Sequence, residues 1–105
     1  TLGDFVVADM DNDGSSEYVI GAGKGDLGYI NYINNDGKIK RKFWAYTDVL
    51  KADMQLIVVD FNQDKNMDIV SFVPGNKVIV WTGKSKKLFN WLPPEGYNLL
   101  FLAKN

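Results

Sequence analysis

The strongest constraint in this sequence is an internal repeat with a period of 51 residues. Residues 6–19, VVADMDNDGSSEYV, align without a gap on residues 57–70, IVVDFNQDKNMDIV. Asp9 recurs as Asp60, and most other aligned positions are identical or conservatively exchanged. Because similar sequences form similar local structure, a chain with this repeat has to fold as two units of the same kind.

Each unit has the pattern of four β-strands. The apolar runs are short, rich in β-branched and aromatic residues, and separated by Asp, Asn and Gly. They occupy residues 5–8, 18–20, 29–33, 56–59, 69–73 and 78–81. We divide the chain into a first blade-like repeat, residues 1–51, and a second, residues 52–105, which ends in a further apolar strand at residues 99–102. We expect each repeat to form a four-stranded antiparallel sheet.

The connections between the expected strands carry turn residues. Asn-Asp-Gly at 35–37 lies between two apolar runs and indicates a hairpin with a tight primed turn, which requires positive φ. Pro-Gly-Asn at 74–76 and Pro-Pro-Glu-Gly at 93–96 indicate two further turns. Residues 47–55 have room for one helical turn with a capping residue. The expected fold class is therefore all-β.

An acidic loop occupies the same place in both repeats. Oxygen-bearing side chains stand at loop positions 1, 3, 5 and 9, and position 7 offers its backbone carbonyl. The candidate ligands are Asp9, Asp11, Asp13, Ser15 and Glu17 in the first loop, and Asp60, Asn62, Asp64, Asn66 and Asp68 in the second. A loop that curls round an ion turns alternate side chains inward, and Ca²⁺ takes six to eight oxygen ligands. We therefore predict Ca²⁺ as the cofactor of these loops.

The first loop has the stronger case for a cation. It places four carboxylates within nine residues, and each pair about 4 Å apart would repel by roughly 4 kcal/mol at an effective dielectric constant near 20. The second loop has Lys65 in place of Gly14 and the amide of Asn62 in place of a carboxylate. The alternative for both loops is a turn connector whose carboxylates accept backbone N–H bonds and hold no ion.

Two other cation sites fit this spacing less well. Magnesium prefers fewer protein ligands and keeps its own waters. An EF-hand needs a bidentate Glu at loop position 12, which is Ile20 in the first loop and Ser71 in the second. It also needs flanking helices, whereas these loops lie between expected strands.

The arrangement of strand, Asp-x-Asp-x-Asp-Gly-x-x-Asp/Glu and hydrophobic strand resembles the FG-GAP repeat, also called the VCBS or integrin α-type repeat. The resemblance covers residues 5–91, and the second loop matches more loosely than the first. A clear Phe-Gly and Gly-Ala-Pro signature is missing, although Gly-Ala-Gly at 21–23 lies in the corresponding region. The resemblance implies calcium ligands at the ten loop positions, β-propeller blades, and an extracellular protein that binds proteins or glycans.

Two blades cannot close a propeller ring. Each blade buries its faces against its neighbours, so an isolated pair exposes two apolar sheets. We therefore expect this chain to be a fragment of a larger propeller or to complete a ring as a homo-oligomer.

Composition excludes several functions. The chain has no His and no Cys, so a Ser-His-Asp triad, a thiol nucleophile and zinc held by His or Cys are impossible within it. With 12 Lys+Arg against 13 Asp+Glu, it lacks the basic excess of a nucleic-acid binder. No apolar run approaches the roughly 20 residues that span a bilayer, so we expect no membrane insertion. The other carboxylates are scattered, and we predict that the chain is not an enzyme.

Two further groups of residues are candidates for ligand binding. Basic clusters occur at Lys38, Lys40, Arg41 and Lys42, and at Lys84, Lys86 and Lys87. They could bind an acidic glycan or phosphate, or form solvated faces that protect edge strands. The aromatic candidates for sugar stacking are Tyr29, Tyr32, Trp44, Tyr46, Trp81 and Trp91. We expect most of these aromatic side chains to lie in the core between blades.

The sequence as a whole predicts a calcium-binding, propeller-type repeat module that recognises a protein or a glycan outside the cell or on its surface. One alternative is a lectin-like oligomer with sugar sites between its blades. Another is a non-catalytic accessory part of a carbohydrate-active enzyme.

Overall fold

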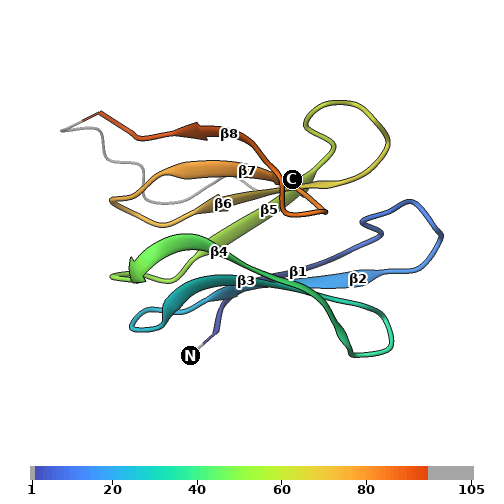
Figure 1. Cartoon of the computed structure of the whole chain (residues 1–105), viewed down its shortest axis with the longest axis horizontal. Helices are drawn as coiled ribbons and strands as arrows, with labels where there is room; N and C mark the ends of the chain where they lie inside the picture. Colours follow the sequence, from blue (N-terminus) through green and yellow to red (C-terminus); the bar gives the residue numbers. More distant parts are fainter. Residues whose placement is uncertain (1, 95–105) are drawn as a thin grey trace.

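The computed structural model describes residues 2–94, which form two four-stranded antiparallel sheets stacked face to face (Figure 1). The first sheet contains β1 (Leu2–Ala8), β2 (Glu17–Ala22), β3 (Leu27–Ile33) and β4 (Ile39–Val49) in sequence order. The second contains β5 (Gln55–Val59), β6 (Asp68–Phe72), β7 (Val78–Thr82) and β8 (Lys87–Trp91). The expected all-β class and the two four-stranded sheets are confirmed for these residues. The expected strand at 99–102 lies outside them.

Residues 2–94 contain no helix, and so none that is long and apolar enough to cross a membrane. The helical turn expected at 47–55 was therefore wrong. β4 continues to Val49, which pairs with Leu27 of β3, and the N–H of Leu50 donates to the carbonyl of Asp26 at 2.9 Å. Pairing with a neighbouring strand satisfies these backbone groups, whereas an isolated helical turn fixes several dihedrals for one hydrogen bond.

The 51-residue repeat extends to the strand register. Val6 lies opposite Val19 in the first sheet, and Ile57 lies opposite Val70 in the second. Each of these residues is 51 positions from its counterpart. Since successive side chains of a strand point to opposite faces, equivalent residues of the two repeats face the same side of their own sheet.

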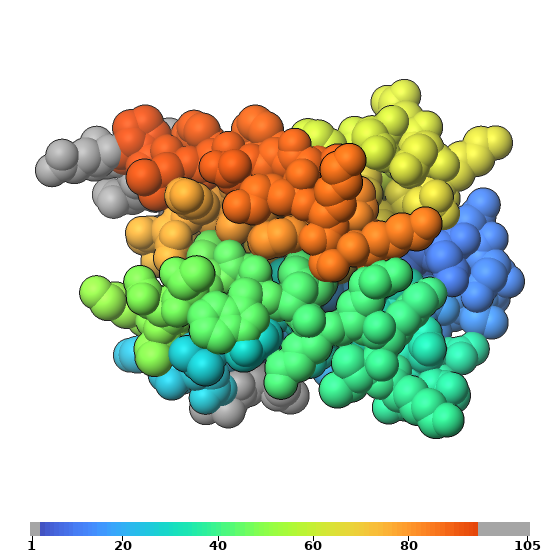
Figure 2. Space-filling view, in the orientation of Figure 1, coloured from blue at the N-terminus to red at the C-terminus, as the bar shows by residue number. Residues whose placement is uncertain are grey.

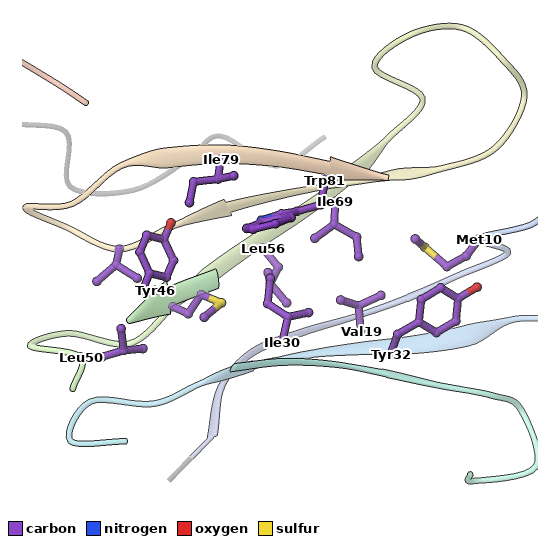
Figure 3. Packing of buried hydrophobic residues seen from close by; sticks show 12 residues of the cluster. Met10, Val19, Ile30, Tyr32, Tyr46, Leu50, Leu56, Ile69, Ile79 and Trp81 are labelled. Atoms are coloured by element: carbon purple, nitrogen blue, oxygen red, sulfur yellow. The ribbon is translucent and has the colours of Figure 1, made fainter. Parts of the chain in front are cut away.

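The hydrophobic core fills the space between the two sheets (Figure 3). The first sheet contributes Val19, Ile30, Tyr32 and Tyr46, and the second contributes Leu56, Ile69, Ile79 and Trp81. Val19 lies in this interface, but its counterpart Val70 follows the core residue Ile69 and so faces the other side of its sheet. The two repeats therefore pack head to tail, with different faces in contact.

The outer face of the first sheet is apolar and exposed. Phe5 of β1 is 60% exposed and Trp44 of β4 is 45% exposed. Trp44 packs edge-on against Tyr29 at a centroid distance of 4.9 Å, and the Lys42 ammonium lies 4.6 Å from the centroid of the Tyr29 ring. The expectation that most of the aromatic residues are in the core was thus only partly correct, because Trp44 and Trp91 are exposed.

The turns at 35–37 and 74–76 are both present, but they are of different types. At 35–37 the N–H of Gly37 donates to the carbonyl of Asn34 at 3.0 Å, and Gly37 alone has positive φ, 85°. This is a type I turn followed by a glycine bulge, so the predicted primed turn was wrong although the hairpin is present. At 74–76 the N–H of Asn76 donates to the carbonyl of Val73 at 2.9 Å, with Gly75 at φ 81°. Proline before a glycine of positive φ forms a type II turn there.

A buried hydroxyl connects the two sheets. The Tyr46 hydroxyl donates to the carbonyl of Lys77 at 2.6 Å and lies 3.4 Å from the Ser71 hydroxyl. Ser71 also accepts a hydrogen bond from the indole N–H of Trp81 at 3.1 Å. Burial raises the pKa of Tyr46 to about 12, so this hydroxyl stays protonated and can donate throughout the neutral range.

We predict that Tyr46→Phe lowers the free energy of unfolding by about 1–2 kcal/mol, because the Lys77 carbonyl loses its donor in a partly buried place. Urea denaturation measures this change. Tyr18→Phe is the matched control, since Tyr18 is on the exposed outer face, and it should change stability by less than about 0.5 kcal/mol. Equal losses in the two variants would contradict the role assigned to Tyr46.

Candidate metal centres

The two acidic loops leave the same end of the stacked sheets (Figure 1). The first loop joins β1 to β2, and the second joins β5 to β6. In Figure 2 they lie at one end of the molecule, the second loop in yellow above the first in blue. The head-to-tail packing of the repeats thus brings two equivalent loops to one edge.

The two loops share the same internal hydrogen bonds. The carboxylate at position 1, Asp9 or Asp60, accepts the N–H groups of positions 5 and 6, at 3.1 and 2.8 Å in the first loop and 3.0 and 2.8 Å in the second. The carboxylate at position 5, Asp13 or Asp64, accepts the N–H of position 7 at 2.8 or 3.0 Å. Positions 4 and 6 have positive φ in both loops. The repeat therefore specifies one loop conformation twice.

The carboxylate at position 9 is buried in both loops. Glu17 is 3% exposed and accepts the N–H of Met10 at 2.9 Å. Asp68 is 1% exposed and accepts the N–H of Phe61 at 2.9 Å. Because β2 and β6 begin at these residues, the strand pairing fixes where each carboxylate points. Each loop is closed at its base by this one side chain.

The acidic side chains converge in both loops. In the first loop one carboxylate oxygen from each of four residues lies within 4.8 Å of the others; the four are Asp9, Asp11, Asp13 and Glu17. In the second loop the same holds for Asp60, Asp64 and Asp68. These are acidic clusters that could hold a metal ion, and every carboxylate named from the sequence belongs to one of them.

The Asn62 side-chain amide lies among the three carboxylates of the second loop. With its nitrogen turned toward them, it donates to Asp64 at 3.0 Å and to Asp60 and Asp68 at 3.3 Å. With its oxygen turned toward them, it adds a fourth oxygen to the cluster, which a cation would then have to hold together. The same side chain can therefore close an ion-free loop or act as a ligand.

Ser15 and Asn66 occupy position 7 of their loops. Their N–H groups donate to Asp13 and Asp64, respectively, which fixes the backbone at this position. Ligation through their carbonyl oxygens stays a prediction. Asp11 of the first loop also faces the Lys40 ammonium at 3.6 Å, so a basic side chain offsets part of the negative charge at the loop edge.

The pKa of Glu17 is raised mainly because the carboxyl is buried and also because Asp11, Asp13 and Asp9 are close, although the hydrogen bond from the Met10 N–H lowers it in part. The pKa of Asp68 is raised by burial and by Asp64 and Asp60, although backbone N–H bonds lower it in part. Folding without a cation therefore opposes ionisation at position 9 of each loop. A bound cation would offset this cost.

A cleft of about 390 Å³ opens between the loops. Asp11 lines it from the first loop and Asp64 from the second, while Arg41 of β4 and Lys84 of the β7–β8 turn add basic groups. The sequence identified both basic clusters but gave no sign that they meet, because they belong to different repeats. Lys40 also lines the cleft, whereas the other lysines of these clusters, such as Lys86, do not.

Comparison of this chain with protein-family models, with curated proteins and with solved structures found no match in any of the three. What the two loops can bind therefore depends on the distances, burial and hydrogen bonds within residues 2–94.

We predict that Glu17→Gln stabilises the metal-free protein at pH 7. The folded protein holds the Glu17 proton to a higher pH than the unfolded chain does, so stability falls as pH rises above the ordinary pKa of 4.5 through the raised value. The amide removes this charge and keeps an oxygen for the Met10 N–H. Thermal melts in chelator at pH 7 should show a higher Tm for Glu17→Gln than for wild type.

Below the ordinary pKa of Glu17 the advantage of Glu17→Gln should disappear, because the carboxyl is then protonated in both states. Asp48→Asn, which changes an exposed carboxylate in β4, is the control and should leave Tm unchanged at both pH values. A lower Tm for Glu17→Gln in chelator at pH 7 would contradict the prediction.

Lys65 adopts a backbone conformation that favours glycine, φ 72°, at the position where the first loop has Gly14 at φ 88°. We predict that Lys65→Gly raises the free energy of unfolding by about 1 kcal/mol, because a non-glycine residue costs about that much in this region. Urea denaturation measures it. Lys65→Ala removes the charge but keeps the Cβ, so an equal gain in this control would assign the effect to charge instead of backbone strain.

Proposed function

We propose that this chain is a calcium-binding, propeller-type repeat module that recognises a protein or a glycan. The observation that carries the proposal is the repetition of one loop, with the same hydrogen bonds and convergent carboxylates, between the first two strands of two stacked sheets. This is the arrangement implied by the resemblance to FG-GAP repeats. An extracellular or surface location belongs to the same proposal.

The geometry of the first loop suits calcium. Oxygen ligands lie about 2.4 Å from Ca²⁺, so two ligands on opposite sides of the ion are about 4.8 Å apart. The four carboxylate oxygens of the first loop lie within 4.8 Å of one another, so one cation could contact all four. Mg²⁺ holds its ligands at about 2.0–2.1 Å and prefers to keep several waters. A set of four carboxylates from one loop therefore favours the larger ion.

The proposed role of calcium is structural. Glu17 belongs to the acidic cluster and also accepts the Met10 N–H, while the Met10 carbonyl accepts the N–H of Met67 at 2.9 Å. An ion in the first loop would thus strengthen a chain of contacts that reaches the second repeat. It would fix the loop between β1 and β2 and so the angle between the two sheets.

The propeller-type assembly is supported by the direction of packing. Met10 is 2% exposed because the second sheet covers it, whereas Phe61, at the same loop position in the second repeat, is 51% exposed. Head-to-tail interfaces form rings when the rotation between units closes. The second repeat therefore offers the position that a further repeat would cover, in a longer protein or in another copy of this chain.

The oligomeric alternative is favoured by one observation, the apolar outer face of the first sheet. Phe5 and Val7 of β1 are 60% and 50% exposed there, and a contiguous apolar patch of this kind is typical of an interaction site. Completion of a ring by further copies would bury it. The same face would serve equally well for a protein partner.

We predict that millimolar calcium raises the Tm of the chain and that magnesium raises it much less. A ligand that binds only the folded state stabilises it by about 2.7 kcal/mol at a hundredfold excess over its Kd. Differential scanning calorimetry in calcium, in magnesium and in chelator tests this. Asp11→Ala should abolish most of the rise, because Asp11 is an exposed member of the first cluster.

Asp48→Ala is the control for the calcium response and should melt like wild type in each buffer, because Asp48 lies in β4, outside both clusters. Glu17→Gln is a second test. It should raise Tm in chelator and reduce the rise in Tm that calcium causes. Identical melting of the wild type in calcium and in chelator would reduce both loops to turn connectors and refute the proposal.

A further inference from the structure

The cleft between the loops is built from both repeats. Lys40 and Arg41 reach it from β4, and Lys84 reaches it from the turn between β7 and β8. Met10 and Tyr32, which lie next to each other at one end of the core (Figure 3), form an apolar part of its wall. Its volume of about 390 Å³ lies within the range of pockets that bind small molecules.

Arg41 lines this cleft. Its Nε atom is buried and has no hydrogen-bond partner among the described residues. A buried donor without a partner costs free energy, which a ligand oxygen would recover if the side chain turns Nε toward the cleft. The planar guanidinium suits a carboxylate, to which it can donate two parallel hydrogen bonds. Lys40 and Lys84 add two further positive charges around the same space, and Asp11, 3.6 Å from the Lys40 ammonium, offsets one of them in part.

Another part of the cleft wall carries acceptors. Asp64 and Asn66 line it from the second loop, together with Asp68 at the start of β6. A ligand group that faces these residues has to donate hydrogen bonds, as a sugar hydroxyl does. A doubly charged phosphate would instead be repelled by the carboxylates. The lining therefore suits a ligand that carries both a negative charge and hydroxyl groups.

We propose that this cleft binds an acidic sugar, with its carboxylate at Arg41 and its hydroxyl groups facing Asp64 and Asn66. The inference deepens the glycan-binding part of the proposed function and rests on it, but it does not require calcium in either loop. It also gives a function to Lys40, Arg41 and Lys84, which the packing of the two sheets brings together from different repeats.

Titration calorimetry of the full chain with glucuronate, in millimolar calcium, tests the proposal. Saturable binding is expected, and glucose and inorganic phosphate should bind at least tenfold more weakly. Arg41→Gln should weaken glucuronate binding by roughly tenfold to a hundredfold, the loss expected for a charge-assisted hydrogen bond. The methyl glycoside of glucuronate distinguishes a free sugar from a sugar unit linked in a glycan. If it binds as tightly as free glucuronate, the ligand is a glycan-linked unit. If its binding is lost, the ligand is a free sugar.

A matched pair of exposed lysines keeps the test valid if Arg41→Gln fails to fold. Lys84 lines the cleft, whereas Lys86, in the same turn, does not. Lys84→Met should weaken glucuronate binding at least threefold, and Lys86→Met should leave it unchanged. No saturable glucuronate binding, equal binding of glucose, or equal losses in the two lysine variants would overturn the inference.

Melting curves in calcium and in chelator, recorded on the same samples, separate this inference from the calcium site. A calcium-dependent Tm without glucuronate binding would overturn the sugar site alone. Glucuronate binding without a calcium response would support the sugar site and refute the calcium site.

Discussion

The arrangement of the two repeats depends on the contacts that Met10 makes. Its N–H is held by the buried carboxylate of Glu17, and its carbonyl accepts the N–H of Met67 from the second repeat. Its side chain is buried in the core between the sheets. One residue thus joins the first acidic loop, the second loop and the hydrophobic interface, so any change in the charge of the loop acts on the packing of the sheets.

The buried carboxylates make the loops a source of both order and instability. Burial and neighbouring Asp side chains raise the pKa values of Glu17 and Asp68, so the charged loops oppose folding while their hydrogen bonds favour it. A divalent cation would remove this conflict without changing the strands. An ion held by either cluster would therefore act on the stability of the fold.

Head-to-tail packing explains the two surfaces that distinguish this chain. It leaves the outer face of the first sheet exposed at Phe5 and Trp44. It also places two loops and two basic hairpins around one cleft. A head-to-head stack of the same sheets would instead bring identical faces together.

The sequence by itself determined the strands, the loop conformation and the carboxylates of each cluster, because these depend on residues within about ten positions of one another: Asp9 caps its own loop, and Glu17 starts the next strand. Strand length depended on more than the local sequence, since β4 extends to Val49 by pairing with Leu27 of β3. Only the tertiary structure decided which face of each sheet is buried and that Arg41 and Lys84 share one cleft. Those features depend on how one sheet packs on the other, and no local pattern of residues specifies that.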